Sequence, residues 1–223
     1  MTHAPELVVL DLAGTTVRDR GEVPSAFRDA LAEHGLSATD DEVRAVRGAS
    51  KREAILRFVP EGADRAPLAA RAFASFLAHL SRRYERDGVA PIPGAAEAVA
   101  RLRDRGVRIA LNTGFDRSIT ALLLSSLGWD RGLADVVVCG DDVSRGRPAP
   151  DLILAAMRAA GVEDSTRVAS AGDTTLDLRA GEAARVGWNV GVLSGAHDRT
   201  ALVAAPHTHI LASVAELPEL FFS

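Results

Sequence analysis

The sequence has a single cysteine, Cys139, so it cannot form an internal disulfide. It has no apolar run of about 18 residues, the length that a membrane-spanning helix requires. The net charge of −4 at pH 7 provides no broad attraction for nucleic acid or anionic lipid. Residues 1–10 also lack the ordered basic, apolar and small residues of a secretion signal. We therefore expect a cytoplasmic protein without nucleic-acid or membrane partners.

Lysine is almost absent, because Lys51 is the only lysine among 26 basic residues. An exposed lysine can be exchanged for arginine at little cost, since either residue supplies a solvated positive charge. The lysine that persists therefore suggests a position where an amine is needed. Otherwise, 47% hydrophobic and 25% charged residues in a chain of 223 are typical of a globular protein with one main domain and room for an insert.

Short apolar runs alternate with helical patterns along most of the chain. The runs cover residues 7–10, 107–111, 136–138, 168–171 and 190–193. The helical patterns cover residues 94–105, 118–127, 150–160 and 176–184. Continuous apolar runs are typical of buried parallel strands. The alternation therefore predicts an α/β fold, with a doubly wound, Rossmann-like parallel sheet.

One long segment does not fit this alternation. Residues 26–86 contain several helix-like stretches and no convincing strand, and turn-forming residues flank them on both sides. We predict an α/β core formed by residues 1–18 and 90–223, with a helical cap inserted over residues 19–89. The two linkers would then act as hinges for a lid.

Polar residues follow the apolar runs, where ligands bind in open α/β sheets. They are residues 11–16 (DLAGTT) after the first run, 112–114 (NTG) after the second and 172–177 (GDTTLD) after the fourth. Residues 146–150 (GRPAP) lie between the last two segments. Acids, threonines, an arginine and glycines at one edge are suited to binding Mg²⁺ and a phosphoryl group.

In this order, the four segments resemble the motifs of the haloacid dehalogenase superfamily. The resemblance implies that Asp11 is the nucleophile, that Thr113 binds phosphoryl oxygens and that Arg147 neutralises their charge. It also implies that Asp177 is catalytic and completes the metal site. The implied Mg²⁺ ligands are Asp11, Ala13 and Asp173. The implied substrate-binding residues are Ala13, Gly14, Thr15, Gly48, Gly114 and Arg47.

Ala13 is a departure from most phosphatases of this superfamily, which carry a second aspartate at that position to protonate the leaving group. General acid catalysis contributes about 10² to 10⁴-fold, so efficient ester hydrolysis is disfavoured here. Ala13 together with Arg147 resembles the phosphonoacetaldehyde hydrolases, or phosphonatases, whose leaving group is carbon. In that family a cap lysine condenses with the substrate aldehyde, and the resulting iminium accepts the electrons of the C–P bond.

Lys51 is the candidate for that cap lysine, because it follows Gly48 by three positions, as in the family. Ser50 and Glu53 have the spacing of a capping box, which predicts that a helix begins at Lys51. The positive helix end, neighbouring Arg47 and Arg52, and partial burial would all lower the pKa of the amine. The alternative is that Lys51 is a solvated surface residue.

Three other positions differ from the phosphonatases proper. Ala54 and Arg47 replace a histidine and a methionine near the lysine, and Phe115 replaces a tyrosine. The substrate is therefore expected to be phosphonoacetaldehyde or another 2-oxoalkylphosphonate, with Arg47 as a candidate contact for an extra anionic group. The alternatives are a phosphomonoesterase resembling phosphoglycolate phosphatase and a catalytically silent binding module. The family resemblance also implies a homodimer formed through the cap.

Overall fold

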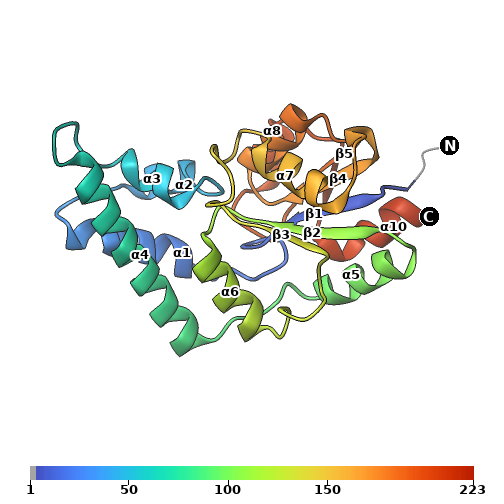
Figure 1. Ribbon diagram of the computed structural model, residues 1–223, viewed down its shortest axis with the longest axis horizontal. Helices are drawn as coiled ribbons and strands as arrows, with labels where there is room; N and C mark the ends of the chain where they lie inside the picture. Colours follow the sequence, from blue (N-terminus) through green and yellow to red (C-terminus); the bar gives the residue numbers. More distant parts are fainter. Residues whose placement is uncertain (1–3) are drawn as a thin grey trace.

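The computed structural model describes residues 4–223 and contains one six-stranded sheet in the order β3-β2-β1-β4-β5-β6 (Figure 1). All neighbouring strands are parallel, which confirms the predicted α/β fold. The strand order reverses direction at β1, so the crevice beyond β1 and β4 is the expected ligand position. The strands are β1 (Leu7–Asp11), β2 (Arg108–Asn112), β3 (Val136–Val138), β4 (Val168–Gly172), β5 (Trp188–Val192) and β6 (His209–Leu211).

Helices cover both faces of this sheet, with α7 and α8 on one face and α5, α6 and α10 on the other (Figure 1). The alternation of β1 explains why both faces need cover. Leu7 and Val9 belong to the apolar cluster that contains α7, whereas Val8 and Leu10 belong to the cluster on the opposite face. The core helices are α5 (Ala95–Asp104), α6 (Arg117–Ser126), α7 (Asp151–Ala160), α8 (Thr175–Ala184), α9 (Arg199–Val203) and α10 (Leu217–Phe222).

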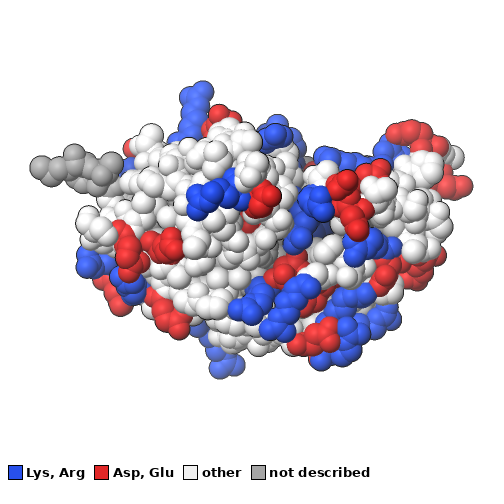
Figure 2. All heavy atoms as spheres, turned by 180° about the vertical axis from the view of Figure 1, so that it is seen from behind, with Lys and Arg blue, Asp and Glu red and all other residues white. Residues whose placement is uncertain are grey.

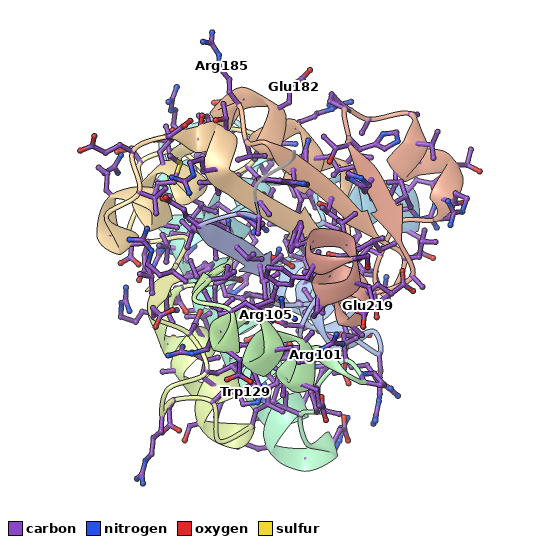
Figure 3. All side chains as sticks on the ribbon, turned by 90° about the vertical axis from the view of Figure 1, so that its right-hand side faces the viewer. Arg101, Arg105, Trp129, Glu182, Arg185 and Glu219 are labelled. Atoms are coloured by element: carbon purple, nitrogen blue, oxygen red, sulfur yellow. The ribbon has the colours of Figure 1, made fainter. Side chains whose placement is uncertain are left out.

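The C-terminal helix α10 packs against α5 (Figure 3). Arg101 of α5 and Glu219 of α10 form an ion pair at 2.6 Å, and the Arg105 guanidinium lies 5.0 Å from the centre of the Phe222 ring. This pairing was not predicted from the sequence. These two contacts hold the C-terminal helix against α5.

The segment between β1 and α5 is helical, as predicted, and contains no strand. Its helices are α1 (Glu22–Glu33), α2 (Asp40–Ala45), α3 (Lys51–Leu56) and α4 (Arg65–Asp87). Phe27 and Phe76 pack edge to face at 6.2 Å between ring centres, so these helices have an apolar centre of their own. We call them the cap; its proposed limits, residues 19 and 89, stay a prediction.

The two linkers of the cap are hydrogen-bonded to each other. The backbone N–H of Arg18 donates to the Ala90 carbonyl at 2.9 Å, and the N–H of Ile92 donates to the Thr16 carbonyl at 2.8 Å. Val17 and Pro91 form an antiparallel bridge between these bonds. The chain therefore enters and leaves the cap through one paired, two-stranded connection.

Helix α3 begins at Lys51 as predicted, but the predicted capping box is wrong. The Ser50 side chain makes no capping hydrogen bond, and the Glu53 carboxylate accepts from the backbone N–H of Gly146 at 3.2 Å. Gly146 belongs to the core, so the Glu53 carboxylate bonds across the interface between cap and core instead of capping its own helix. A capping box is present instead at the start of α2, between Thr39 and Glu42.

Glycines allow the cap loop, residues 47–50, to lie directly against the core. A methyl group added at Gly114 would lie 2.6 Å from the Ala49 carbonyl oxygen. One added at Gly48, where φ is +84°, would lie 2.5 Å from the Thr174 hydroxyl. The backbone N–H of Lys51 also donates to the Gly114 carbonyl at 3.4 Å. The cap is therefore closed on the carboxyl edge of the sheet.

The outer surface shows no dominant charge on the face seen in Figure 2, where basic and acidic side chains are intermixed. No helix within residues 4–223 combines the length and apolar character needed to cross a bilayer. The intermixed charges agree with the low net charge of the sequence.

Closure of the cap loop should depend on the missing side chain at Gly114. We expect Gly114→Ala to keep its melting temperature within about 2 °C but to speed amide exchange in residues 47–53 about tenfold, because the new methyl would clash with Ala49. Hydrogen–deuterium exchange by mass spectrometry measures this. The matched change Gly191→Ala clashes with Ile210 inside the core, so it should lower the melting temperature and leave the loop protected. Equal protection in both variants would contradict a glycine-dependent closure.

Candidate active site

The carboxyl ends of β1, β2 and β4 and the cap loop enclose one cavity. Its volume is about 30 Å³, room for only a few water molecules. Most of the residues predicted for the site lie in its wall, together with several that were not. The lining residues are Asp11, Ala13, Asp19, Val23, Arg47, Gly48, Lys51, Thr113, Gly114, Phe115, Arg147, Asp173 and Thr174.

Three predicted residues lie behind the wall and hold its groups. The Thr15 hydroxyl donates to one carboxylate oxygen of Asp173 at 3.3 Å. Gly14 packs so closely that a methyl group there would lie 2.3 Å from the other oxygen of Asp173. Asp177 accepts from Thr174 at the start of α8 and pairs with Arg147. In this closed state these residues contact the groups that line the cavity rather than the cavity itself.

Arg147 is the most heavily bonded side chain of the site and is 3% exposed. Its Nη1 donates to Asp11 at 2.7 Å, and its Nε pairs with Asp177 at 2.9 Å. Its Nη2 donates to the Asn112 side-chain oxygen, and Nη1 also lies 3.4 Å from the Gly48 carbonyl of the cap. The guanidinium therefore joins three parts of the core to the cap loop.

Lys51 projects from the first position of α3 into this cavity and is 8% exposed. Its Nζ donates to the Ala49 carbonyl at 3.0 Å and lies 5.5 Å from the centre of the Phe115 ring. Burial lowers the pKa of the amine to about 8, with Arg147 and Arg47 adding to the effect and Asp11 opposing it. The surface alternative for Lys51 is thus wrong.

The causes of this shift differ in one respect from those expected from the sequence. Arg52 was expected to repel the Lys51 ammonium, but its guanidinium lies 4.0 Å from the centre of the Phe73 ring, in a cation–π contact. Burial by the closed cap is the largest cause of the shift. The sequence pattern identified the position of Lys51 but could not show which neighbours face it.

Arg47 reaches the cavity, but its guanidinium already forms an ion pair with Asp19. The Asp19 side chain is 3% exposed and also accepts from the backbone N–H of Gly21 at 2.9 Å. An anionic substrate group would have to compete with Asp19 for Arg47. Sequence reasoning missed Asp19 because an aspartate two residues before a glycine is a common turn former, and this one does form that turn.

Asp11 and Asp173 have pKa values well above those of ordinary carboxyl groups. Burial raises the pKa of Asp11 to about 6, and repulsion by Asp177 adds to the effect, whereas Arg147 opposes it. Burial also raises the pKa of Asp173 to about 8, together with repulsion by Asp11 and Asp177. Three carboxyl groups compete for one guanidinium, which is the situation that a bound cation relieves.

A family model described as haloacid dehalogenase-like hydrolase matches residues 5–185. The chain therefore belongs to the haloacid dehalogenase superfamily. This match confirms the resemblance found in the motifs and shows that the protein is a hydrolase of that type.

Relatives of this hydrolase include phosphonoacetaldehyde hydrolases. The protein of that name from Hahella chejuensis is 31% identical over 205 residues, covering 86% of this chain and 69% of its own. The one from Bacillus cereus is 29% identical, covering 86% and 77%.

Solved structures of similar fold carry different descriptions. A phosphonoacetaldehyde hydrolase-like protein from Oleispira antarctica superposes with a TM-score of 0.86 at 23% identity, covering 99% of this chain and 92% of its own. A structure described as that of a phosphoglycolate phosphatase, from Lactobacillus delbrueckii, superposes with a TM-score of 0.78 at 19% identity, covering 98% of each chain. At these identities the structures show the fold of the hydrolase and not its substrate.

The donor atoms in the cavity of this hydrolase fit Mg²⁺. The carboxylates of Asp11 and Asp173 and the Ala13 carbonyl are hard oxygen donors, which Mg²⁺ prefers. Within residues 4–223 the Ala13 carbonyl accepts no hydrogen bond. Asp173 is oriented by the Ala196 backbone N–H at 2.6 Å. Asp177 has its oxygens engaged by Arg147 and Thr174, so its predicted part in the metal site would be indirect in this closed state.

Binding of Mg²⁺ to this site should tighten as the pH rises. Both carboxyl groups must lose their protons before they can bind a cation, and their raised pKa values put that loss between about pH 6 and 8. We expect the affinity, measured by titration calorimetry, to rise up to about tenfold per pH unit in that range. Asp173→Asn should abolish binding. Glu182→Gln alters an exposed acidic group outside the cavity and should leave the affinity unchanged. An affinity independent of pH would argue against these ligands.

Proposed function

We propose that the protein is a Mg²⁺-dependent hydrolase that cleaves the C–P bond of a small 2-oxoalkylphosphonate. The observation that carries the proposal is Lys51, whose buried amine shares one small cavity with Asp11. The residue two positions after Asp11 is Ala13, and its methyl side chain cannot donate a proton. An amine that forms an imine with the substrate carbonyl would stabilise the leaving group without that acid.

Lys51 would act first, as a neutral amine. Its Nζ would add to the substrate carbonyl, and loss of water would leave a protonated imine. A pKa of about 8 gives a substantial neutral fraction near physiological pH, whereas an ordinary lysine has very little. Closure of the cap supports this role, since burial in the closed state is the main cause of the lowered pKa.

Asp11 would then attack phosphorus and form an acyl phosphate. The electron pair of the C–P bond would move into the iminium and leave an enamine on Lys51. Water would cleave the acyl phosphate, releasing phosphate and restoring Asp11. A second water and a proton would release the carbonyl product and restore the amine. Mg²⁺, held by Asp11, Asp173 and the Ala13 carbonyl, would supply charge neutralisation for the phosphoryl oxygens.

Thr113 and Arg147 are placed to hold the transferring group. The Thr113 hydroxyl oxygen accepts from the Phe115 backbone N–H at 3.1 Å, which leaves its own hydrogen to donate to a phosphoryl oxygen. The Arg147 guanidinium keeps its charge while bound to Asp11, so it offsets the repulsion between that carboxylate and an anionic substrate. Both residues line the cavity.

Substrate entry requires the cap to open, because the closed cavity holds only a few waters. The paired linkers and the loop at Gly48 are the connections about which such motion would occur. Reclosure would bring Lys51 to the core and exclude water from the acyl phosphate.

Lys51→Arg should separate this mechanism from ester hydrolysis. The variant keeps a positive charge but cannot form an imine, so we expect phosphate release from phosphonoacetaldehyde to fall by at least about 10³-fold. Borohydride should trap a substrate adduct on Lys51 in the wild type, detectable by peptide mass spectrometry, and none in the variant. Arg71→Lys, an exposed change on α4, controls for substitution of a basic residue. Undiminished release from the phosphonate by Lys51→Arg would refute the imine.

A phosphomonoesterase is the second candidate, and Asp19 is the observation in its favour. Asp19 is a buried carboxyl group in the cavity wall and could in principle replace the acid missing at Ala13. Its engagement by Arg47 weighs against that use.

Ala13→Asp tests whether the missing acid limits ester hydrolysis. If Ala13 is the cause, the new aspartate should raise phosphate release from a small phosphate ester by about 10²-fold and lower release from the phosphonate. An assay of both substrates with Mg²⁺ measures the change. A wild type that already hydrolyses the ester faster than the phosphonate, with no gain from Ala13→Asp, would favour the second candidate.

A further inference from the structure

A second, apolar cavity adjoins the first at Lys51. Val23, Arg47 and Lys51 line both cavities, so the same side chains separate them. Every residue that lines only the second cavity is apolar: Pro24, Phe27, Val43 and Val46. We propose, building on the proposed function, that this cavity holds a methyl group on the substrate carbonyl carbon. The preferred substrate would then be a methyl ketone, 2-oxopropylphosphonate, rather than an aldehyde.

The chemistry of the wall restricts what the second cavity can hold. Its valines, Phe27 and Pro24 offer no side-chain hydrogen-bond donor or acceptor. The only charged groups at its edge are Lys51, which would be bonded to the substrate, and Arg47, which is paired with Asp19. A hydroxyl or carboxylate substituent would be buried there without a partner. An alkyl group would be stabilised by the same burial.

The size of the cavity restricts the length of that group. Its volume is about 10 Å³, which matches about one water-sized group and is too small for a longer chain. Phe27, Val43 and Val46 are themselves buried in the cap, at 2%, 4% and 6% exposure, so the wall cannot easily move aside. One methyl group is therefore the substituent that fits.

Covalent geometry keeps one substituent of the carbonyl carbon close to Lys51, which lines both cavities. Once Nζ of Lys51 is bonded to the carbonyl carbon, one of the other two groups on that carbon is the CH₂ attached to phosphorus. That group must extend toward Asp11 in the first cavity. The remaining group stays within two bonds of Nζ and is a hydrogen in an aldehyde or a methyl in the ketone. The reaction then balances as before, with acetone and phosphate as products in place of acetaldehyde and phosphate.

Competition among three phosphonates tests the inference. With Mg²⁺ present, kcat/KM for phosphate release would be measured with phosphonoacetaldehyde, 2-oxopropylphosphonate and 2-oxobutylphosphonate. We expect the methyl ketone to exceed both others by about tenfold or more, the usual effect of one methyl group in a fitted pocket. A preference for the aldehyde would overturn the inference and leave the proposed function standing.

Variants of Val46 make the same test independent of the intrinsic reactivity of ketones. Val46→Leu adds bulk beside the cavity and should lower the ratio of ketone to aldehyde kcat/KM about tenfold. Val46→Ala should shift the preference toward 2-oxobutylphosphonate. The matched control Val59→Ala removes a buried cap valine outside both cavities and should leave the ratios unchanged.

The outcomes separate the two proposals. Unchanged ratios in both Val46 variants would refute the methyl pocket even if the enzyme cleaves phosphonates. Phosphate release from an ester and from none of the three phosphonates would refute the proposed function and, with it, this inference.

Discussion

The buried ion pair between Arg147 and Asp11 is the interaction on which the rest of the site depends. Within residues 4–223, only this pair and the pair of Arg147 with Asp177 have both side chains almost completely removed from solvent. A buried charge is tolerated only when it is paired, and the guanidinium pairs with Asp177 as well. When Asp11, Asp173 and Asp177 are all ionised, the single positive charge of Arg147 leaves two negative charges on the core side. That deficit equals the charge of one divalent cation.

The same guanidinium connects the charge balance to the position of the cap. Because it also contacts the Gly48 carbonyl, the loop that leads to Lys51 is seated on the charged centre of the core. Burial in the closed site is the main cause of the low pKa of Lys51. An open cap would return the amine to water and to its ordinary, protonated state. The nucleophilic amine and the closed site are therefore two aspects of one conformation.

Much of the fold could be predicted because its determinants are local. Continuous apolar runs located five of the six strands, and the four motifs located most of the core residues that line the cavity. The errors occurred where a distant partner competes with a local one. Glu53 has the spacing of a capping residue but bonds to Gly146, and Arg52 stacks on Phe73 instead of facing Lys51. Asp19 and the apolar wall around Val46 belong to no motif, so only the packing of the cap revealed them.

The paired linkers determine how the cap can move. If the two linkers were separate, the cap could twist, slide and swing relative to the core. Each of these motions would be lost when the cap closes. Hydrogen bonds between Arg18 and Ala90 and between Ile92 and Thr16 join the linkers into one ribbon, which leaves the cap fewer independent motions than two separate linkers would. Closure of the cap then costs little conformational entropy, because the paired linkers already exclude most orientations of the open cap. Lys51 would approach Asp11 along nearly the same arc in every catalytic cycle.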